Sequence, residues 1–542
     1  MSRTPHQDGF VKESLSESQL ATTLSQGSST KKESINDVRT SYEQKTDANG
    51  IILIPQPSDD PADPLNWPLR KKIIIFACIC LSGFAGQMSP NSNQLTFMLQ
   101  VPNYVGRTSD DLLNSVAAGL AGWMAGPFII TPLAGAIGRP AVVLYSLIGT
   151  FACQIWAANM DGPDDFMPFL FSRLVCGMFG VIPAIMGVGF IMDMFFLHQR
   201  GKAFALFEVL IIFAVVGGGT LGGFIAETNP WTYVFWWTLG PIGGAIISVF
   251  LFVEDTTFDR TPGAIQRQLP TGYFANRMAT FFIGTRTQPS GQRLATVKFR
   301  AISPIKIVFT PVTIMVGMYV FVALGLPIMQ ASTMAVYMMP PEVAGGYGLS
   351  SLRLAFFTMT AWLGMFAAQL YGYLFNDKIP LYVAKRKGGA WHPEYRLSNV
   401  ILPGIILPIG LGIWGAGIEH HLDIVLLAFA GFLIWFSALL ILPVCYNYIV
   451  ECFTDNPVEA AVALNGYRIS FGIMSVFVST RWDEAVGVGW MWGMGSFFVV
   501  FVNIVMLFVI FKGHLVRQWS FSKSIAAAED GERIMSSPAY GA

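Results

Sequence analysis

Two ionisable side chains lie inside long apolar stretches of this chain, and they offer the most specific chemistry in its sequence. Glu208 stands between Phe207 and Val209, and Arg173 stands in the apolar stretch 171–180. A carboxyl group in such a place can take up and release a proton as its access to water changes. Glu208 is therefore a candidate for proton transfer or for binding a cationic part of a ligand. The alternative is an ordinary ion pair with a neighbouring base such as Lys202.

Arg173 is costly where it stands. An arginine in the middle of an apolar helix costs ~2.5–3.5 kcal/mol on membrane-insertion scales. We therefore expect Arg173 to face the interior of a helix bundle, where carbonyls and polar neighbours could satisfy it without any further role. The rise of a helix places Arg173 and Glu208 about 20 Å apart along the bundle axis, so a direct pair is not expected.

Uncharged polar side chains concentrate at a few places in the apolar stretches. The second half of the first stretch is polar and contains Pro90, which interrupts helix hydrogen bonding. A later stretch has polar groups after Pro327, and paired breaks of this kind point to a binding site. Polar groups in lipid are expensive. We therefore expect a polar path, lined by Gln87, Asn91, Asn93, Gln94, Gln330, Tyr337, Tyr446 and Asn447.

Twelve long apolar stretches must position these groups. A bilayer core of ~30 Å needs ~20 mostly apolar residues per helical crossing, and only helices or closed barrels satisfy their backbones there. The stretches are too long, and too continuously apolar, to be barrel strands. We therefore predict an all-α membrane protein with spans near residues 73–97, 112–134, 140–158, 166–192, 203–226, 231–253, 308–338, 353–374, 398–417, 422–450, 459–480 and 487–511.

The composition agrees with a membrane protein and disfavours other classes. Hydrophobic residues make up 53% of the 542 residues and charged ones only 13%. The formal net charge is zero, so nothing favours nucleic acid as a partner. No metal, cofactor or enzymatic activity is expected, because no His, Asp or Glu cluster has metal or nucleophile spacing. The six cysteines match no zinc or redox motif, and we expect them to pack as small apolar residues.

Basic residues near the ends of spans set the orientation. Arg70, Lys71 and Lys72 precede the first span, which places the N-terminus in the cytosol. Most other bases fall in the same set of loops, above all in a central loop that divides the spans six and six, as in transporters built from two repeats. A Ser/Thr cluster between Ser14 and Ser34 is either a phosphorylation region or a plain solvated tail. We predict a disordered cytosolic tail at 1–69, a six-helix half at 70–253, the central loop at 254–307, a second half at 308–511 and a cytosolic tail at 512–542.

Short motifs outside the spans resemble those of a known family. The segment 55–61, followed by Asp63-Pro64-Leu65-Asn66-Trp67-Pro68 and Arg70-Lys71-Lys72, resembles the pre-membrane signature of fungal drug:proton antiporters of the major facilitator superfamily. His392-Pro393-Glu394-Tyr395-Arg396-Leu397 is similar to a second signature of that group. The resemblance covers about residues 50–515. It implies the major facilitator fold, with twelve transmembrane helices in two six-helix halves.

The resemblance assigns roles to several charged residues. The loop 132–140 keeps Gly138 and Arg139 of the family's charge-cluster motif, but Gly135 replaces its acid. Arg139 is expected to pair with Asp193 as a gate, or else to belong to a merely positive loop. Arg173 matches the family's R-x-x-x-G motif, which implies a place on the proton-coupling path.

Two further patterns resemble the same family. The stretch 216–223 keeps the two final glycines of the antiporter motif, but Gly219 stands where that motif has proline. Small residues in this stretch let helices approach closely whatever the function. The second pattern near the inner mouth, an acid followed by a later Asn and Arg, resembles fungal carriers and is formed here by Glu451, Asn465 and Arg468. We expect Glu451 and Arg468 to pair as a gate, with a purely structural pair as the alternative.

The resemblance implies a proton-coupled secondary transporter that moves a small organic solute by alternating access. Export of a toxic compound or secondary metabolite is the main expectation. Import of a nutrient or polyamine-like cation by proton symport is the alternative, and a non-transporting membrane sensor is a third hypothesis. No Walker sequence is present, which disfavours ATP-driven pumping. The expected partners are the solute, protons and the bilayer, and we expect a monomer in the plasma membrane or, alternatively, in a vacuolar or other internal membrane.

Overall fold

Helices dominate the part of the chain that the structure describes, and no strand occurs in that part. The computed structural model describes residues 53, 55–258, 270, 272–282, 290–376, 378–386, 392–453 and 456–520. The Ser/Thr cluster between Ser14 and Ser34 and most of the two predicted tails lie outside these residues. The chain divides into a unit that ends at Pro57 and a unit that begins at Ser58, and every helix below belongs to the second.

Twelve helical segments are long and apolar enough to cross a membrane, as predicted. The first six are α2 (Leu69–Met88), α3 (Ser109–Ile130), α5 (Arg139–Ala158), α6 and α7 (Phe166–Gly180, Ile182–Met194), α8 (Leu197–Ala226), and α9 and α10 (Tyr233–Trp236, Leu239–Phe252). The last six are α13 (Pro311–Met338), α14 (Ser351–Phe375), η7 and α16 (Pro393–Val400, Ile401–Glu419), α17 (Ile424–Cys452), α18 (Pro457–Val486) and α19 (Val488–Ser520). The shorter elements are η1 (Pro64–Asn66), η2 (Ser89–Asn91), η3 (Phe97–Gln100), η4 (Thr131–Leu133), α4 (Ala134–Ile137), α11 (Tyr273–Phe281), α12 (Ser290–Val308), η6 (Glu342–Ala344) and α15 (Lys378–Arg386).

Local sequence signals set several helix ends. Thr108 and Asp111 form a capping box before α3, in which the Asp111 amide donates to Thr108 Oγ1 at 3.3 Å. Ser350 and Asp423 cap α14 and α17 with their side-chain oxygens. Proline stands in the first turn of α5, α13 and α18, where its missing N–H leaves no bond unmade.

The first span ends earlier than predicted. We expected it near 73–97, but α2 ends at Met88 and the chain tightens into η2. Pro90 has no N–H to continue the helix, and the side chains of Ser89 and Asn91 donate to the carbonyls of Ala85 and Gln87 at 2.6 and 2.7 Å. Residues 92–97 then form buried turns and the start of η3. The amides after Pro90 therefore lie on irregular backbone.

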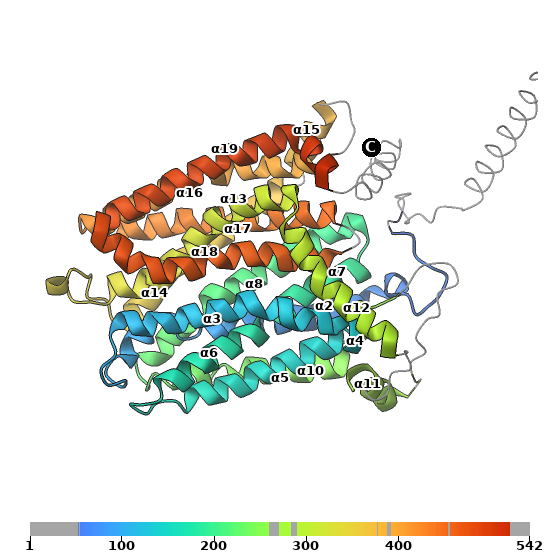
Figure 1. Cartoon of the computed structure of the whole chain (residues 1–542), viewed down its shortest axis with the longest axis horizontal. Helices are drawn as coiled ribbons and strands as arrows, with labels where there is room; N and C mark the ends of the chain where they lie inside the picture. The colour runs from blue at the N-terminus through green and yellow to red at the C-terminus, as the bar shows by residue number, and fades with distance from the viewer. Residues whose placement is uncertain are drawn as a thin grey trace, which may run out of the picture. The chain divides into compact units, whose positions relative to one another are not determined.

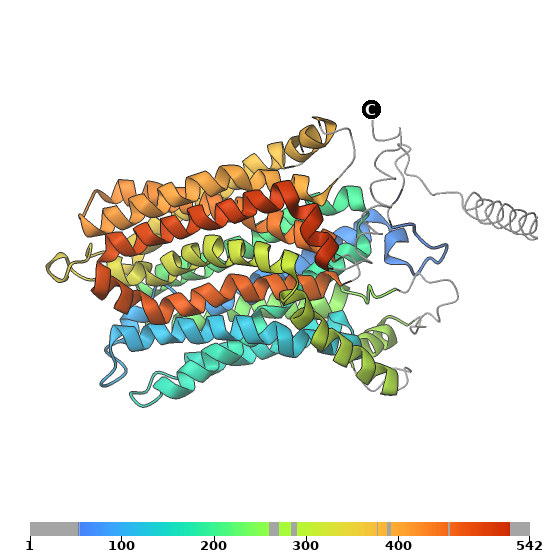
Figure 2. The same ribbon diagram turned by 45° about the horizontal axis from the view of Figure 1, so that its top comes forward.

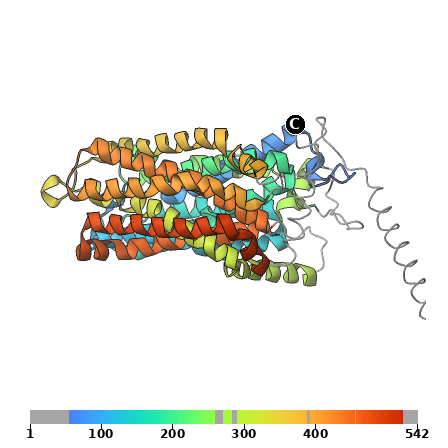
Figure 3. The ribbon, with the colours of Figure 1, turned by 90° about the horizontal axis from the view of Figure 1, so that it is seen from above.

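The spans form two six-helix halves that pack side by side. In the first half α3 packs on α6 and α2 on α8, and in the second α16 packs on α19 and α14 on α17. Figure 1 shows the second half, yellow to red, against the first, blue to green, and Figures 2 and 3 show the same arrangement from other sides. The seam between the halves is made mainly by α8 with α14 and by α3 with α18. Three non-spanning helices, α11, α12 and α15, lie at one end of the bundle (Figure 1), which we call the central-loop end; the opposite end is the far end.

Small residues permit the close helix approaches predicted for the stretch 216–223. Gly222 of α8 packs on the backbone of Ser92, and a Cβ atom there would collide with the Ser92 carbonyl oxygen. Gly122 of α3 packs in the same way on the Leu174 carbonyl of α6. The six cysteines are buried free thiols, in agreement with their predicted role as small apolar residues.

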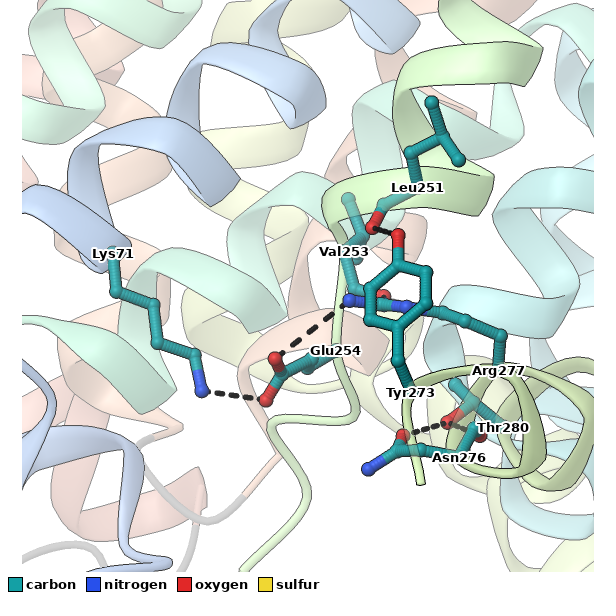
Figure 4. A network of polar contacts seen from close by, with 8 residues as sticks. All are labelled: Lys71, Leu251, Val253, Glu254, Tyr273, Asn276, Arg277 and Thr280. Carbon is teal, nitrogen blue, oxygen red and sulfur yellow. Dashed lines mark hydrogen bonds and ion pairs between the residues drawn. The ribbon is translucent and has the colours of Figure 1, made fainter. Parts of the chain in front are cut away.

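A chain of charged groups ties the start of α2 to the end of α10 and to α11. Glu254 accepts a hydrogen bond from Lys71 Nζ at 2.6 Å and lies 3.7 Å from the guanidinium of Arg277 (Figure 4). Tyr273 donates to the Leu251 carbonyl at 2.7 Å. Arg277 is buried. The polar side of α11 is therefore fixed against the first half.

Candidate functional site

Two cavities lie where the halves meet, and a third lies within the first half. The Glu208 cavity is nearer the central-loop end of α8 and is lined by residues of α2, α7, α8, α17 and α18. The seam cavity is lined by residues of α8, α13, α14 and α17 and by Gln94 and Leu95. The third cavity lies between the segment at Pro90 and α3. Each is narrow, with room for about one water molecule.

The Glu208 cavity brings opposite charges from the two halves into one space. Glu208 comes from α8 in the first half, whereas Tyr446 and Arg468 come from α17 and α18 in the second. Arg468 donates to Asn465 Oδ1 at 2.9 Å, and Asn465 Nδ2 donates across the seam to the Trp123 carbonyl at 3.1 Å. The arginine is thus held beside the acid by a residue that also joins the halves.

Several polar atoms of this cavity have no partner among the residues that the structure describes. Glu208 is 7% exposed, yet it makes no hydrogen bond or ion pair with any of them. Neither amide atom of the fully buried Gln87 has a partner there, and nor does Arg468 Nε. Buried polar groups are normally paired, and exceptions often mark functional sites. The Glu208 cavity is therefore a candidate site for a proton, water or polar ligand atoms. The alternative pair between Glu208 and Lys202 does not form in the described structure.

The seam cavity combines aromatic, thioether and amide groups. Phe357, Met334 and Trp435 supply apolar surface, and Trp435 Nε1 donates to Gln330 Oε1 at 3.1 Å. Thr358 faces the same cavity and lies 2.7 Å from Thr220 Oγ1 across the seam. An apolar lining with a few placed polar groups is typical of sites for small organic molecules, and the seam would have to widen here to admit one.

Arg173 faces the interior of the first half, as predicted. Its side chain is 1% exposed and donates to the Pro90 carbonyl and to Asn93 Oδ1, the latter at 2.9 Å. Its guanidinium lies 5.2 Å from the centre of the Phe235 ring. Arg173 therefore satisfies the carbonyl that the break at Pro90 leaves free, and it lines neither of the two cavities at the seam.

The predicted lining residues separate into several groups. Gln87 and Tyr446 line the Glu208 cavity, Gln330 lines the seam cavity, and Gln94 lines the seam cavity and the third one. Two do not fit. Tyr337 contacts Asp483 at the far end of α18, with its hydroxyl 3.5 Å from the carboxylate, because it lies two turns beyond Gln330 along α13. Asn447 lines none of the three cavities, whereas Asn91 and Asn93 line the third.

A charged cluster lies at the central-loop end of the seam. Arg139 pairs with Asp193, as predicted, and Asp193 also accepts from Thr256 Oγ1 at 2.8 Å. Arg300 of α12 lies beside this pair, 4.0 Å from Glu459 at the start of α18. Burial lowers the pKa of Arg300, and Glu459 opposes that shift. We call these residues the latch; the sequence predicted its first pair but not Arg300 or Glu459, which no motif marks.

The predicted pair between Glu451 and Arg468 is wrong for this structure. Glu451 lies at the end of α17 and pairs with Arg396 of η7 at 2.6 Å. Arg468 lies about three turns into α18, too deep in the bundle to reach the end of α17. Beside Glu451, Arg517 donates to both oxygens of Glu394 at 2.7 and 3.1 Å. These pairs all lie within the second half, so they hold that half together.

Polar contacts also cross the seam at the far end. The Glu227 carboxylate at the end of α8 accepts from the Leu352 amide in the first turn of α14 at 2.9 Å. Thr480 of α18 donates to Asp110 of α3 at 3.4 Å. The Glu208 and seam cavities thus lie between bridging contacts at both ends of the seam.

The sequence did not mark Trp435 and Thr358 as site residues. Asn465 was noticed with Arg468 as part of a family pattern, and their three-residue spacing places both on one helix face. Trp435 and Thr358 lie within apolar runs that contain no motif. Only the packing of the two halves brings them to the seam.

Known proteins that are similar to most of this chain belong to one family of transporters. The family model of the Major Facilitator Superfamily matches residues 75–479. An efflux pump from Floropilus chiversii, radE, is 26% identical over 467 residues, which covers 83% of this chain and 80% of that relative. The multidrug transporter TPO1_1 of Candida glabrata is 24% identical, covering 85% and 79%. The MFS-type transporter penM of Penicillium rubens is 27% identical, covering 89% of each.

Solved structures with the same arrangement of helices are more distant in sequence. The proton:xylose symporter XylE superposes with a TM-score of 0.58 at 14% identity, covering 82% of this chain and 96% of that one. The human organic anion transporter MFSD10 superposes with a TM-score of 0.53 at 15% identity, covering 81% and 100%. At these identities the likeness concerns the fold.

Proposed function

Because this chain belongs to the Major Facilitator Superfamily and is a membrane transporter rather than an enzyme, we propose that it exports a small organic solute by proton-coupled alternating access. The single observation that carries the coupling is the carboxylate of Glu208, which has no partner among the residues that the structure describes and shares a cavity with Arg468 of the other half. A proton on Glu208 weakens its attraction to Arg468, and loss of that proton strengthens it. The charge state of one residue therefore changes the attraction between the halves at the cavity.

The direction and the cargo follow from two supports. Relatives that span most of this chain include an efflux pump and a multidrug transporter. The seam cavity offers Phe357, Met334 and Trp435 beside the amide of Gln330, which suits a partly apolar molecule with a few hydrogen-bonding groups. A polyamine-like cation is a poor match for the Glu208 cavity, because Arg468 lines the same space and would repel it.

The orientation and the location belong to the same proposal. The bases before α2 and around α11, α12 and α15 support a cytosolic central-loop end, with both termini in the cytosol. We place the protein in the plasma membrane as a monomer, where export would remove a toxic compound or secondary metabolite from the cell. A non-transporting sensor would not need polar cavities between its halves.

The test is transport by the purified full chain in lipid vesicles with an imposed pH gradient, measured for a panel of neutral and cationic aromatic dyes. We expect dye movement against its gradient when protons move the opposite way. Glu208→Gln should abolish movement driven by the pH gradient while keeping dye exchange without a gradient. Glu342→Gln removes an exposed acid from the loop before α14 and should behave as wild type. A Glu208→Gln carrier with full pH-driven transport would refute the coupling role.

A further inference from the structure

Helix α12 crosses the seam at the central-loop end. It contacts α4 and η4 of the first half and α18 and α13 of the second. Its inner side contains the buried Ser303 and Ile307 and brings Arg300 to the latch, 4.0 Å from Glu459. A movement of this helix therefore acts on the contact that closes that end.

The outer side of α12 is apolar and exposed. Phe299 is 58% exposed, Ile305 50% and Phe309, just past the helix end, 72%. With Ile302 they recur at the three- and four-residue spacing of one helix face. Exposed apolar side chains gathered on one side of a helix mark a binding surface on a soluble protein and a lipid contact on a membrane protein.

This face continues directly into the membrane-spanning surface. α13 begins two residues after Phe309, and its outward residues Ile314 and Met318 are 36% and 40% exposed. The apolar side of α12 therefore belongs to the same belt as the lipid-facing side of α13. The opposite side of α12 faces the protein with Arg300, Ser303 and Ile307.

The charge of residues 260–341, which we call the central segment, favours an anionic lipid. Residues 260–341 contain eight Lys or Arg and no Asp or Glu. Two of the bases, Lys298 and Lys306, are exposed on α12 and stand on the same outward side as its exposed apolar residues. Long lysine side chains on such a side can reach out of the apolar layer with their ammonium groups, which then lie among the headgroups and attract anionic lipids.

A second helix of the same segment has a similar outward face. On α11, Phe274 is 74% exposed and Met278 43%, while the buried Arg277 holds the helix to the first half through Glu254 (Figure 4). The central segment thus presents apolar side chains outwards at two places at the central-loop end.

We propose that α12 is a membrane-surface helix that binds anionic phospholipid through Lys298 and Lys306, and that this binding holds Arg300 in the latch. The apolar residues of its outer face enter the leaflet at the central-loop end, which the proposed orientation makes the cytosolic one. Anionic lipid then keeps the central-loop end of the seam closed for longer. Each lysine near an anionic surface contributes about a fivefold factor in binding.

The first experiment locates the outer face. Ile305→Cys, labelled with bimane in the purified full chain, is reconstituted with phosphatidylcholine that carries a spin-label quencher on its acyl chains. Val343→Cys is the control, because residue 343 is fully exposed in a far-end loop; the six native cysteines are buried and give the background in the parent protein. We expect lipid quenching at 305 and not at 343. Quenching at 305 by aqueous iodide alone would overturn the membrane-surface position.

The second experiment tests the choice of lipid. Hydrogen exchange of residues 297–308 is measured in nanodiscs of phosphatidylcholine alone and of phosphatidylcholine with phosphatidylserine. We expect phosphatidylserine to slow exchange about 25-fold, the product of two fivefold factors, and Lys298→Gln with Lys306→Gln to remove that effect. Lys202→Gln with Lys512→Gln removes two exposed bases elsewhere at the same end and should preserve it.

Equal exchange in the two lipid mixtures would overturn the proposal. The proposal would also be overturned if both double variants lost the slowing by phosphatidylserine to the same extent. The position of the lysines on α12 would then not matter. Neither experiment depends on a transported solute. Their failure would therefore leave the proposed transport function untouched.

Discussion

Neutralising Asp193 should open the central-loop end of the seam. Asp193 accepts from Arg139 and from Thr256, and it lies near Arg300 of α12. Hydrogen bonds to charged groups contribute about 1.5–3 kcal/mol each. The Arg139 and Asp193 side chains are 11% and 20% exposed, so partial solvation reduces the loss on Asp193→Asn to about 1.5 kcal/mol. A change of that size shifts the equilibrium between closed and open states about tenfold.

The assay is the alkylation rate of a cysteine inside the Glu208 cavity. Val188→Cys places a thiol on the wall of that cavity, at a position that is 2% exposed. A membrane-impermeant maleimide added from the central-loop side should react about tenfold faster when Asp193→Asn is also present. Asp164→Asn, on an exposed far-end loop, is the matched control and should leave the rate unchanged. An unchanged or slower rate in the Asp193→Asn background would refute the latch.

Three further predictions concern stability. Glu394→Gln should lower the free energy of unfolding in detergent by about 3 kcal/mol, because it leaves the mostly buried guanidinium of Arg517 without its carboxylate. The Arg396–Glu451 pair is more exposed, so Arg396→Gln should cost less stability; a larger loss for Arg396→Gln would contradict this reasoning. The Tyr104 hydroxyl donates to the Met160 carbonyl at 2.6 Å, and burial raises the pKa of Tyr104. Its contribution to the free energy of unfolding is therefore complete below the ordinary tyrosine pKa of about 10 and is lost as pH rises above that value. Thermal unfolding from pH 8 to 11 should therefore show a steeper fall for wild type than for Tyr104→Phe, and parallel curves would count against it. Gly122→Val should sharply reduce folded yield by gel filtration, since a Cβ there meets the Leu174 carbonyl, whereas Gly119→Ala, which meets nothing, should be neutral.

The spans could be predicted because the bilayer imposes a length and an apolar composition on each crossing. The error at the first span has a local cause. Apolar residues resume at Leu95 and Phe97, but the backbone turns before them. Arg173 binds the free carbonyl of Pro90 at this turn. A hydropathy pattern does not report such a side-chain bond.

The candidate site was predicted only in part, because its members come from helices far apart in the sequence. Glu208 and Gln87 could be identified as polar residues in apolar stretches. Their cavity partners Tyr446 and Arg468 were noticed, but Arg468 was assigned to Glu451 because both were placed near one mouth of the bundle. Depth along α18 decides that pairing, and depth depends on how the helix sits against its neighbours. Arg300 lies beside the Arg139–Asp193 pair because α12 packs against both halves across the seam. The sequence of the loop does not show where this helix packs.

The most direct test of proton coupling at Glu208 is proton release on solute binding. A dye that the vesicle assay identifies as cargo is added to the purified full chain in weakly buffered detergent solution, with a pH indicator as the readout. The account predicts that binding releases protons in the wild type and in Glu342→Gln, and that Glu208→Gln binds the dye without releasing them. Binding with no proton release in the wild type, or undiminished release in Glu208→Gln, would contradict it.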